Sequence, residues 1–425
     1  MTKYQFLSKE KLTPIHQLPD PFRKPDGTRV SSPEEWPEQQ EYIRQMLAFY
    51  LYGPMPPAPG NTKGEVLYRR SVYNSRAVAE TIRITCGPED SIAFVCQMIR
   101  PAKQGKVPVI VWNQMKDRLG CPNEEEVVLK YGYAIVEFER EQVADDNANA
   151  RNGAIAKAYP EYECGAIAMW AWAQSRVVDY LATTDYTDME KIVATGHSRG
   201  GKIAMCCAIY DPRIAVCVTS GSGSGGAGCF RYLGGRLGEG TGLCETAGSM
   251  ADAIAYWWCD EFCNYGLRGQ THTRRDMPVL ANQAEQMKMM NLNLLGKVGD
   301  EAYLPFDLHF LRAAIAPRAI ISTDGLADTW ANPYGTQITW RAASEVFRFL
   351  GVPERNALVL RDGGHAYQKL DWQHAISFCN EMFYGEPMDL NIQVRRLNVQ
   401  PSPHPALDNW SDACYHFDWR APEVK

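Results

Sequence analysis

The sequence lacks several features that would assign it to other classes of protein. No stretch of about 18 consecutive apolar residues occurs, so no transmembrane helix is expected. Positive charge is not in excess, because 44 Lys and Arg stand against 50 Asp and Glu, which gives a net charge of -6. This balance argues against a nucleic-acid-binding protein and against a polybasic membrane-binding protein. The chain also has no internal repeat and no low-complexity tract, and its composition is that of a globular protein.

Cysteine motifs typical of metal sites are missing as well. No Cys-x-x-Cys pair occurs among the 13 cysteines, and the eight histidines show no ligand spacing with them, so no structural zinc site is expected. The number of cysteines is odd, Cys206 and Cys207 are adjacent, and Cys86, Cys96 and Cys217 lie in apolar segments. These features favour reduced, buried thiols. Because the first residues also lack the apolar segment of a signal peptide, a cytoplasmic location is favoured, with secretion as the alternative if a leader has been removed.

The order of the predicted elements favours an α/β fold. Residues 1–60 are rich in proline, carry one predicted helix (33–52) and are expected to form an extension that packs on the core. Residues 61–385 alternate strands with helices, which favours a mostly parallel sheet between helical layers. Within them, 227–300 has poor strand signals and is expected to be a helical insertion near the site; residues 386–425 form a polar tail. The predicted strands are 64–73, 79–86, 91–99, 107–112, 133–138, 192–194, 214–218, 319–322 and 357–360, the predicted helices are 165–181, 340–350 and 372–383, and 139–164 is a predicted loop.

One short stretch in the middle of the chain carries a catalytic motif. The apolar run 192–194 leads into Gly196-His197-Ser198-Arg199-Gly200, and an apolar-periodic helical segment follows. This strand-turn-helix context matches the G-x-S-x-G nucleophile elbow of α/β-hydrolases. A strained turn that lifts Ser198 above a sheet needs small neighbours, because the backbone packs closely at Gly196 and Gly200. The motif therefore predicts Ser198 as a nucleophile; the competing interpretation is a surface loop that contains these residues by chance.

A serine nucleophile needs a base and an acid that orients the base. In α/β-hydrolases these follow in the order Ser, Asp or Glu, then His, each after a strand. His365 follows the last predicted strand in a Gly-Gly-His loop and is the predicted base. Asp324 and Asp328 both follow the strand predicted at 319–322, and on this reasoning either can supply the acid, with a turn-forming role as the alternative for Asp324. His197 is expected to be structural, because the residue before the nucleophile usually points away from the site of attack.

Two cations follow the nucleophile. The backbone N–H of Arg199 is expected to donate in the oxyanion hole. Its guanidinium can stabilise an oxyanion, bind an anionic substrate or pair with a carboxylate of the insertion. Lys202 stands near the start of the following helix, where its charge opposes the helix dipole, which favours a functional role such as a hydrogen bond to a substrate hydroxyl.

The segment Gly196–Lys202 closely resembles the G-[CH]-S-R-x-G-K elbow of the glucuronoyl esterases, carbohydrate esterase family 15, and in particular its bacterial members. The resemblance covers roughly residues 18–383 and includes Leu18–Phe22, Trp170–Trp172, Ser222–Gly226 with Arg231, Leu304–Asp307, Ala316–Arg318, Trp330–Pro333, Gly364-His365 and Asp371-Trp372. It implies an α/β-hydrolase fold, a three-layer sandwich with a helical insertion. It also implies a serine esterase that cleaves esters of (4-O-methyl)glucuronic acid, of the kind that joins glucuronoxylan to lignin alcohols, through an acyl-enzyme and without a metal or organic cofactor.

The resemblance also implies roles for individual residues. Ser198 is the nucleophile, His365 the base and Arg199 the side chain that stabilises the oxyanion. Many members carry the catalytic Glu just before the Ser-Gly-x-Gly-Gly segment, where this chain has Gly221. The acid must then come from the family's other position, in the loop before Trp-Ala-Asn-Pro, which is Asp328.

The same resemblance implies the substrate contacts. Lys202 and Glu245 would bind the hydroxyls of the uronic acid ring, and Trp257 and Trp330 would line the sugar site, since aromatic faces cover apolar C–H surface. The implied partner is a uronic acid ester or a glucuronoxylan oligosaccharide, with no nucleic acid and no membrane. Two alternatives stay open: an acetyl-xylan or feruloyl-type esterase, since a fold does not fix a substrate, and a non-catalytic carbohydrate-binding pseudoesterase, which the glycine at position 221 motivates.

Overall fold

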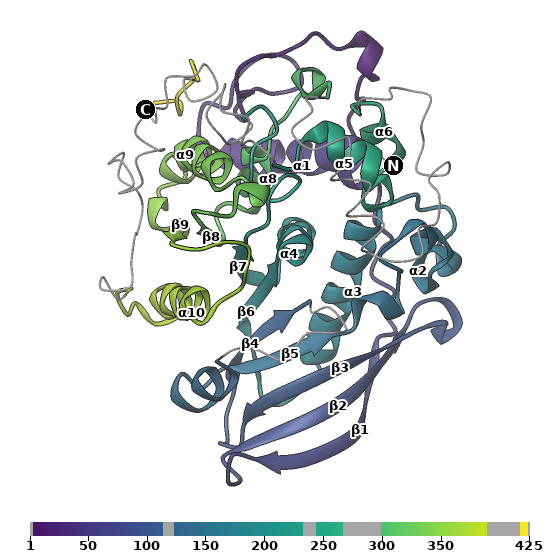
Figure 1. The fold of residues 1–425 in the computed structure, drawn as a ribbon, viewed down its shortest axis with the longest axis vertical. Helices are drawn as coiled ribbons and strands as arrows, with labels where there is room; N and C mark the ends of the chain where they lie inside the picture. The colour runs from purple at the N-terminus through teal and green to yellow at the C-terminus, as the bar shows by residue number, and fades with distance from the viewer. Residues whose placement is uncertain (1–2, 114–122, 233–243, 267–298, 389–416, 424–425) are drawn as a thin grey trace.

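A single sheet forms the centre of the molecule. The computed structural model describes residues 3–113, 123–232, 244–266, 299–388 and 417–423. Within these residues, nine strands form one sheet in the order β1-β2-β3-β5-β4-β6-β7-β8-β9 (Figure 1). The strands are β1 (Lys63–Val72), β2 (Ala77–Cys86), β3 (Ile92–Pro101), β4 (Val107–Trp112), β5 (Ala134–Phe138), β6 (Thr187–His197), β7 (Ile214–Ser220), β8 (Ala319–Gly325) and β9 (Asn356–Arg361).

The sheet is parallel over most of its width. Strands β4 to β9 pair in parallel with one another, whereas β1, β2 and β3 form an antiparallel meander, and β3 joins the sheet by antiparallel pairing with β5. Since β4 lies between β5 and β6, the winding of the chain reverses at β4, and ligands of such sheets bind at the carboxyl ends of the strands near this reversal. The prediction of an α/β fold with a mostly parallel sheet is confirmed.

Helices cover both faces of the sheet. The helices are α1 (Trp36–Leu47), α2 (Ala154–Ala158), α3 (Ala166–Leu181), α4 (Arg199–Tyr210), α5 (Ala247–Ala253), α6 (Asp260–Cys263), α8 (His309–Ile315), α9 (Pro333–Phe349) and α10 (Lys369–Tyr384). Residues of β4 alternate between the two faces: Val109 and Val111 join the core that includes α3 and α4, and Ile110 and Trp112 join the core that includes α10. This period of two is what a strand buried on both faces requires.

Helix α3 is surrounded by the core, as its apolar residues on all sides predicted. The indole of Trp170 is fully buried and donates to the carbonyl of Ala144 at 2.8 Å, so its one polar atom has a partner. Helix α4, which follows the elbow, packs on β6 and β7 and against α3. Burial on all sides fixes the direction of α4 and therefore the place of the residues at its start.

Several elements are longer than the sequence predicted. Strand β8 continues to Gly325, so Asp324 lies within the strand and the turn-forming role considered for it is wrong. Helix α9 begins at Pro333 rather than at residue 340, because Asn332 caps it by accepting the N–H of Gly335 at 3.0 Å and proline is favoured in the first helical turn. The segment 139–164 is not wholly a loop, since it contains α2 and two short 3-10 turns.

The described residues near both ends of the chain pack on the core around the sheet. Phe22 and Trp36 are buried in the main core, and Gln40 of α1 donates to the carbonyl of Ala314 at 2.9 Å. Trp419 donates to the carbonyl of Leu18 at 2.8 Å. Of the segment 227–300, the described part holds α5, α6 and a 3-10 turn; 233–243, 267–298 and most of the tail lie outside the described residues. No helix of the described chain combines the length and apolar character needed to cross a membrane.

Candidate active site

Ser198 lies at a sharp turn between β6 and α4. Its φ is 56° and its ψ is -126°, a left-handed conformation that is costly for a residue with a side chain. A Cβ at Gly196 would lie 2.1 Å from the carbonyl oxygen of Gly200, and a Cβ at Gly200 would lie 2.6 Å from Oδ1 of Asn113. The turn therefore has no room for side chains at either glycine, which is the physical reason for the spacing of the motif. The N–H of Ser198 donates to the carbonyl of Ser220 at 2.8 Å and ties the turn to β7.

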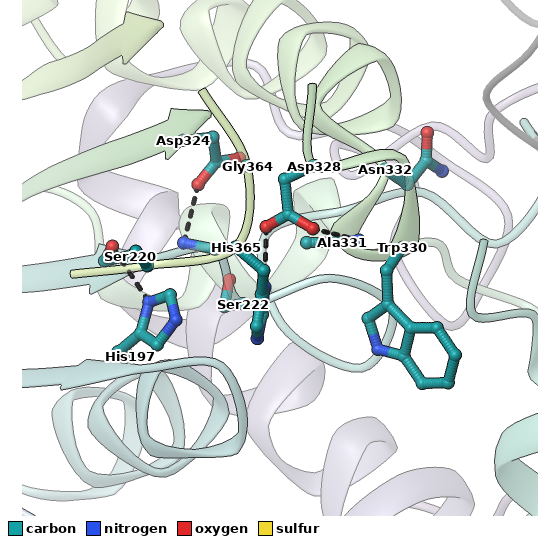
Figure 2. A network of polar contacts seen from close by, with 12 residues as sticks. His197, Ser220, Ser222, Asp324, Asp328, Trp330, Ala331, Asn332, Gly364 and His365 are labelled. Carbon is teal, nitrogen blue, oxygen red and sulfur yellow. Dashed lines mark hydrogen bonds and ion pairs between the residues drawn. The ribbon is translucent and has the colours of Figure 1, made fainter. Parts of the chain in front are cut away.

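His365 and Asp328 form a hydrogen-bonded pair at the same edge of the sheet. Nδ1 of His365 lies 2.6 Å from Oδ2 of Asp328 (Figure 2). The Asp328 side chain is buried, and its other oxygen accepts the N–H of Ala331 at 3.2 Å, so the carboxylate is fixed from both sides. The His365 ring is about one-third exposed and lies beside the ring of His197, with 4.5 Å between the centroids.

The nucleophile and the histidine share one edge of the sheet without a direct hydrogen bond. His197, whose ring lies beside that of His365, immediately precedes Ser198. Among the described residues, no hydrogen bond joins the hydroxyl of Ser198 to His365. Catalytic hydrogen bonds of this kind often tighten only when substrate binds.

Asp324, the other candidate acid, points to a different partner. Its Oδ1 accepts the N–H of Gly221 at 2.9 Å, and the side chain is fully enclosed (Figure 2). Burial raises the pKa of Asp324 to about 6, and the nearby charge of Asp328 adds to the rise although a hydrogen bond from Thr336 opposes it. Asp324 therefore holds the backbone next to the site, while Asp328 holds the histidine.

Gly221 stands at the position where the resemblance led us to expect an acid, and the structure leaves no space for a side chain there. Its φ is 49°. A Cβ there would lie 2.9 Å from Cε1 of His197 and 3.2 Å from Oδ2 of Asp328. His197 and Asp328 thus occupy the space that a side chain at position 221 would need. His197 also packs on Tyr367 and its Nδ1 lies 3.2 Å from the hydroxyl of Ser220, so these contacts fix the ring that lies beside His365.

The Arg199 side chain is held by an acid that the sequence did not single out. Its Nη1 donates to Oδ2 of Asp146 at 2.5 Å, and its guanidinium carbon lies 5.0 Å from the centre of the Trp257 ring. Asp146 lies in the segment 139–164, not in the insertion whose carboxylates were considered as partners. Burial opposes the charge of Arg199, but the Asp146 carboxylate raises the pKa of Arg199 overall. Asp146 follows another aspartate in a polar stretch, and no local pattern distinguishes the two.

Lys202 and Glu245 form a second buried ion pair beside Arg199. Nζ of Lys202 lies 2.9 Å from Oε2 of Glu245 and donates to the carbonyl of Ser222 at 2.6 Å. Burial lowers the pKa of Lys202, and the carboxylate of Glu245 counteracts part of this effect. The other oxygen of Glu245 accepts the indole N–H of Trp330 at 3.2 Å.

The two tryptophans differ in exposure. Trp257 is almost fully buried and also lies 5.7 Å from Nζ of Lys202, so its ring contacts both cations. Trp330 is half-buried. A Cβ at Gly223 would lie 2.2 Å from Oε2 of Glu245, so a glycine is required where the backbone passes this carboxylate. The structure thus brings all the predicted site residues to one region. One group contains Ser198 and the His365–Asp328 pair, the other contains the two cations with Glu245 and the tryptophans, and the adjacent residues Ser198 and Arg199 join them.

A metal-binding cluster does not occur in the described ranges, where no group of three or more His, Cys, Asp and Glu side chains is arranged to hold an ion. The described site consists of Ser198 on the strained turn, the His365–Asp328 pair, and Arg199 and Lys202 with their carboxylate partners.

The parallel sheet, the strained elbow and the His–Asp pair at the carboxyl ends of the strands define the class of α/β-hydrolases. A family model described as "Glucuronyl esterase, fungi" matches residues 82–282 and 270–351, more than half of the chain. The chain belongs to the glucuronyl esterase family.

Individual relatives agree with this membership. The chain is 26% identical over 419 residues to 4-O-methyl-glucuronoyl methylesterase 1 of Wolfiporia cocos, covering 96% of this chain and 89% of that protein. Among solved structures it is similar to a carbohydrate esterase family 15 glucuronoyl esterase from Caldicellulosiruptor kristjansonii, with a TM-score of 0.69 and 27% identity over 94% of this chain and 98% of that one. The fold also matches a serine-to-alanine variant of the Sporotrichum thermophile glucuronoyl esterase in complex with methyl 4-O-methyl-β-D-glucopyranuronate, with a TM-score of 0.65 and 21% identity over 90% and 94% of the two chains.

Proposed function

We propose that this protein is a serine esterase that hydrolyses esters of (4-O-methyl)glucuronic acid, with Ser198 as nucleophile, His365 as base and Asp328 as the acid that orients the base. The observation that carries the proposal is the 2.6 Å contact between His365 and Asp328, formed at the edge of the sheet where the strained elbow presents Ser198. Membership of the glucuronyl esterase family supports the substrate class.

The proposed reaction is a two-step acyl transfer. His365 takes the proton of the Ser198 hydroxyl as its oxygen attacks the carbonyl carbon of the uronate ester. Asp328 fixes the orientation of the ring through Nδ1, which leaves Nε2 to receive the proton, and it stabilises the imidazolium that forms. His365 then gives the proton to the leaving alcohol, and in the second step it activates the water that hydrolyses the acyl-enzyme.

Arg199 supplies positive charge where negative charge develops on the carbonyl oxygen. Its guanidinium is part of the residue next to the nucleophile, and burial strengthens its interaction with an oxyanion because little water screens it. The backbone N–H groups at the start of α4 add donors on the same side. A neutral acetyl ester gains the same stabilisation, so Arg199 serves catalysis in general rather than selection of the acyl group.

The ion pair next to Arg199 is the proposed site for the sugar. Lys202 and Glu245 present a donor and an acceptor that are fixed by each other and by Trp330. A uronic acid ring offers adjacent hydroxyls that can bond to both, and the half-buried face of Trp330 can cover its C–H surface. An acetyl group has neither hydroxyls nor a ring, so this group of residues distinguishes a uronate ester from an acetyl ester.

Hydrolysis of benzyl and methyl glucuronate, measured beside an acetylated and a feruloylated xyloside, tests the proposal. We expect kcat/KM to be highest for the glucuronate esters and the Ser198→Ala variant to be inactive on all of them. A preference for the acetyl or feruloyl ester would contradict the substrate assignment, and full activity of the Ser198→Ala variant would remove the elbow from the mechanism. Binding of the sugar by a wild-type protein that cleaves none of the esters would favour a pseudoesterase.

We also infer that the protein works in a reducing compartment. Buried free thiols support this inference, including the adjacent Cys206 and Cys207 and those of Cys86, Cys96 and Cys217. Alkylation of the denatured protein taken directly from cells should modify all five thiols, and a disulfide between any of them would contradict the inference.

A further inference from the structure

Asp146 lies at the centre of a buried group of polar side chains next to the nucleophile. Its Oδ2 accepts hydrogen bonds from Nη1 of Arg199 at 2.5 Å and from Nη2 of Arg140 at 3.4 Å. Its Oδ1 accepts from the indole N–H of Trp257 at 2.9 Å and from the hydroxyl of Tyr256 at 3.1 Å. Each carboxylate oxygen therefore has two donors, and the carboxylate is fixed in a single orientation.

The charges of this group leave an excess of positive charge. Burial disfavours the charged form of Asp146, but the two arginines and the donated hydrogen bonds hold the pKa of Asp146 below its ordinary value, so the carboxylate is ionised. One carboxylate thus faces two guanidinium groups. Arg140 lies over the Trp170 ring, 5.2 Å from its centre, and donates to the carbonyl of Asn113 at 3.5 Å, so it faces the core.

Arg199 uses only part of its hydrogen-bonding capacity in this group. Its Nη1 contacts Asp146, and its Nε is buried without a hydrogen-bond partner in the part of the chain that the structure describes. An arginine that is held through Nη1 and stacked on Trp257 keeps a fixed plane, which leaves Nη2 to be directed toward a ligand.

We propose that Asp146 is a positioning residue of the reaction: it holds the guanidinium of Arg199 at the place where the oxyanion forms. This inference rests on the proposed function, since it assigns to Asp146 a role that acts through Arg199. A long side chain that is free to rotate must be ordered in the transition state, whereas one that is already fixed stabilises the developing charge without reorganisation. Asp146 does not touch the reacting atoms itself, because all of its acceptor capacity is used within the cluster.

The test measures whether Asp146 and Arg199 act as one unit. The variants are Asp146→Asn, which keeps the size of the side chain and removes its charge, Arg199→Ala, and the two combined. The matched control is Asp179→Asn, because Asp179 also pairs with two arginines, Arg176 at 2.6 Å and Arg213 at 2.7 Å, but contacts none of the site residues. Rates are measured on benzyl glucuronate, and thermal unfolding is measured for every variant.

Asp146→Asn is expected to lower kcat by about 10- to 100-fold with a change in KM of about threefold or less, because the interaction it supports is made in the transition state. In the Arg199→Ala background the same substitution should have almost no further effect. Wild-type kcat in Asp146→Asn, or losses that multiply in the double variant, would overturn the inference. Asp179→Asn should lower thermal stability and leave kcat unchanged.

A second measurement separates this inference from the substrate assignment. A fluorophosphonate probe reacts with an activated serine and forms an oxyanion-like adduct without any uronic acid, so its rate of labelling reports on the catalytic residues independently of sugar binding. Labelling should slow in both Asp146→Asn and Arg199→Ala. It should slow about two- to fivefold in Tyr256→Phe, because this variant removes one hydrogen-bond donor to Asp146 and keeps all charges. Equal labelling rates in wild type, Asp146→Asn and Tyr256→Phe would refute the role of Asp146. If labelling slows in the two variants but wild type does not hydrolyse the uronate ester, only the substrate assignment is refuted.

Discussion

Replacing Asp324 by asparagine should stabilise the protein, and increasingly so as the pH rises. The buried carboxyl of Asp324 has a pKa of about 6, against an ordinary value of 3.8. The folded protein therefore binds this proton more tightly than the unfolded chain does. This tighter binding of the proton stabilises the folded protein. The stabilisation is fully present below about pH 4 and is lost as the pH rises through about 6. Asparagine has no proton to lose, and its carbonyl oxygen can still accept the N–H of Gly221.

The size of the effect follows from the two pKa values. A difference of about two pH units corresponds to about 3 kcal/mol once the group is ionised in both states, at about pH 8, and roughly half of this is already lost at about pH 5. With about 2.1 cal/mol/K of unfolding entropy per residue, 3 kcal/mol corresponds to an increase in Tm of about 3 °C for a chain of 425 residues.

Differential scanning calorimetry of wild type and Asp324→Asn between about pH 5 and pH 8 measures this effect. The advantage in Tm of the variant should roughly double over this range. Asp179→Asn is the control, because removing a carboxylate that pairs with two arginines should lower Tm at every pH. A Tm difference that does not vary with pH, or one in which Asp324→Asn becomes the less stable protein at high pH, would refute the argument from burial.

Three further predictions concern the site itself. Asp328→Ala should lower kcat on benzyl glucuronate by about 10²- to 10⁴-fold, and Asp324→Ala should lower it by less than about tenfold. A larger loss in Asp324→Ala than in Asp328→Ala would assign the catalytic acid to Asp324. Gly221→Ala should lower kcat by about 10- to 100-fold with a smaller effect on Tm, since its Cβ would crowd the His197 ring and the Asp328 carboxylate; wild-type kinetics would contradict this crowding. Lys202→Met should raise KM for the glucuronate and destabilise the protein by about 3–5 kcal/mol in denaturant unfolding, because it leaves the buried charge of Glu245 without its cationic partner; an unchanged KM would remove the pair from substrate binding.

The nucleophile elbow is an example of a feature that can be predicted from neighbouring residues in the sequence. Gly196 is required by the carbonyl oxygen of Gly200, four residues away, so this part of the motif reflects a local contact, whereas Gly200 also faces Asn113, which only the fold brings near. The apolar run of β4, which alternates between two cores, and α3, whose apolar residues occupy every side, can likewise be predicted from the sequence. The limits of α9 were harder to predict, because a single cap at Asn332 extends the helix by two turns.

The choice of acid needed the tertiary structure. Asp324 and Asp328 lie four residues apart on the same segment, and a linear pattern gives both the correct order relative to Ser198 and His365. Only the extension of β8 to Gly325 directs Asp324 toward Gly221 and leaves Asp328 in the loop that meets His365. The resemblance to a known family had favoured Asp328 without giving this physical reason.

The sequence by itself determined the class of fold, the elbow and the order of the catalytic candidates, because strand and helix periodicity and tight turns depend on neighbouring residues. The tertiary structure alone decided which charges face one another. Asp146 is 53 residues from Arg199, and Glu245 is 43 from Lys202. Such pairs form because burial makes an unpaired charge costly, and this requirement leaves no mark on the sequence around either partner.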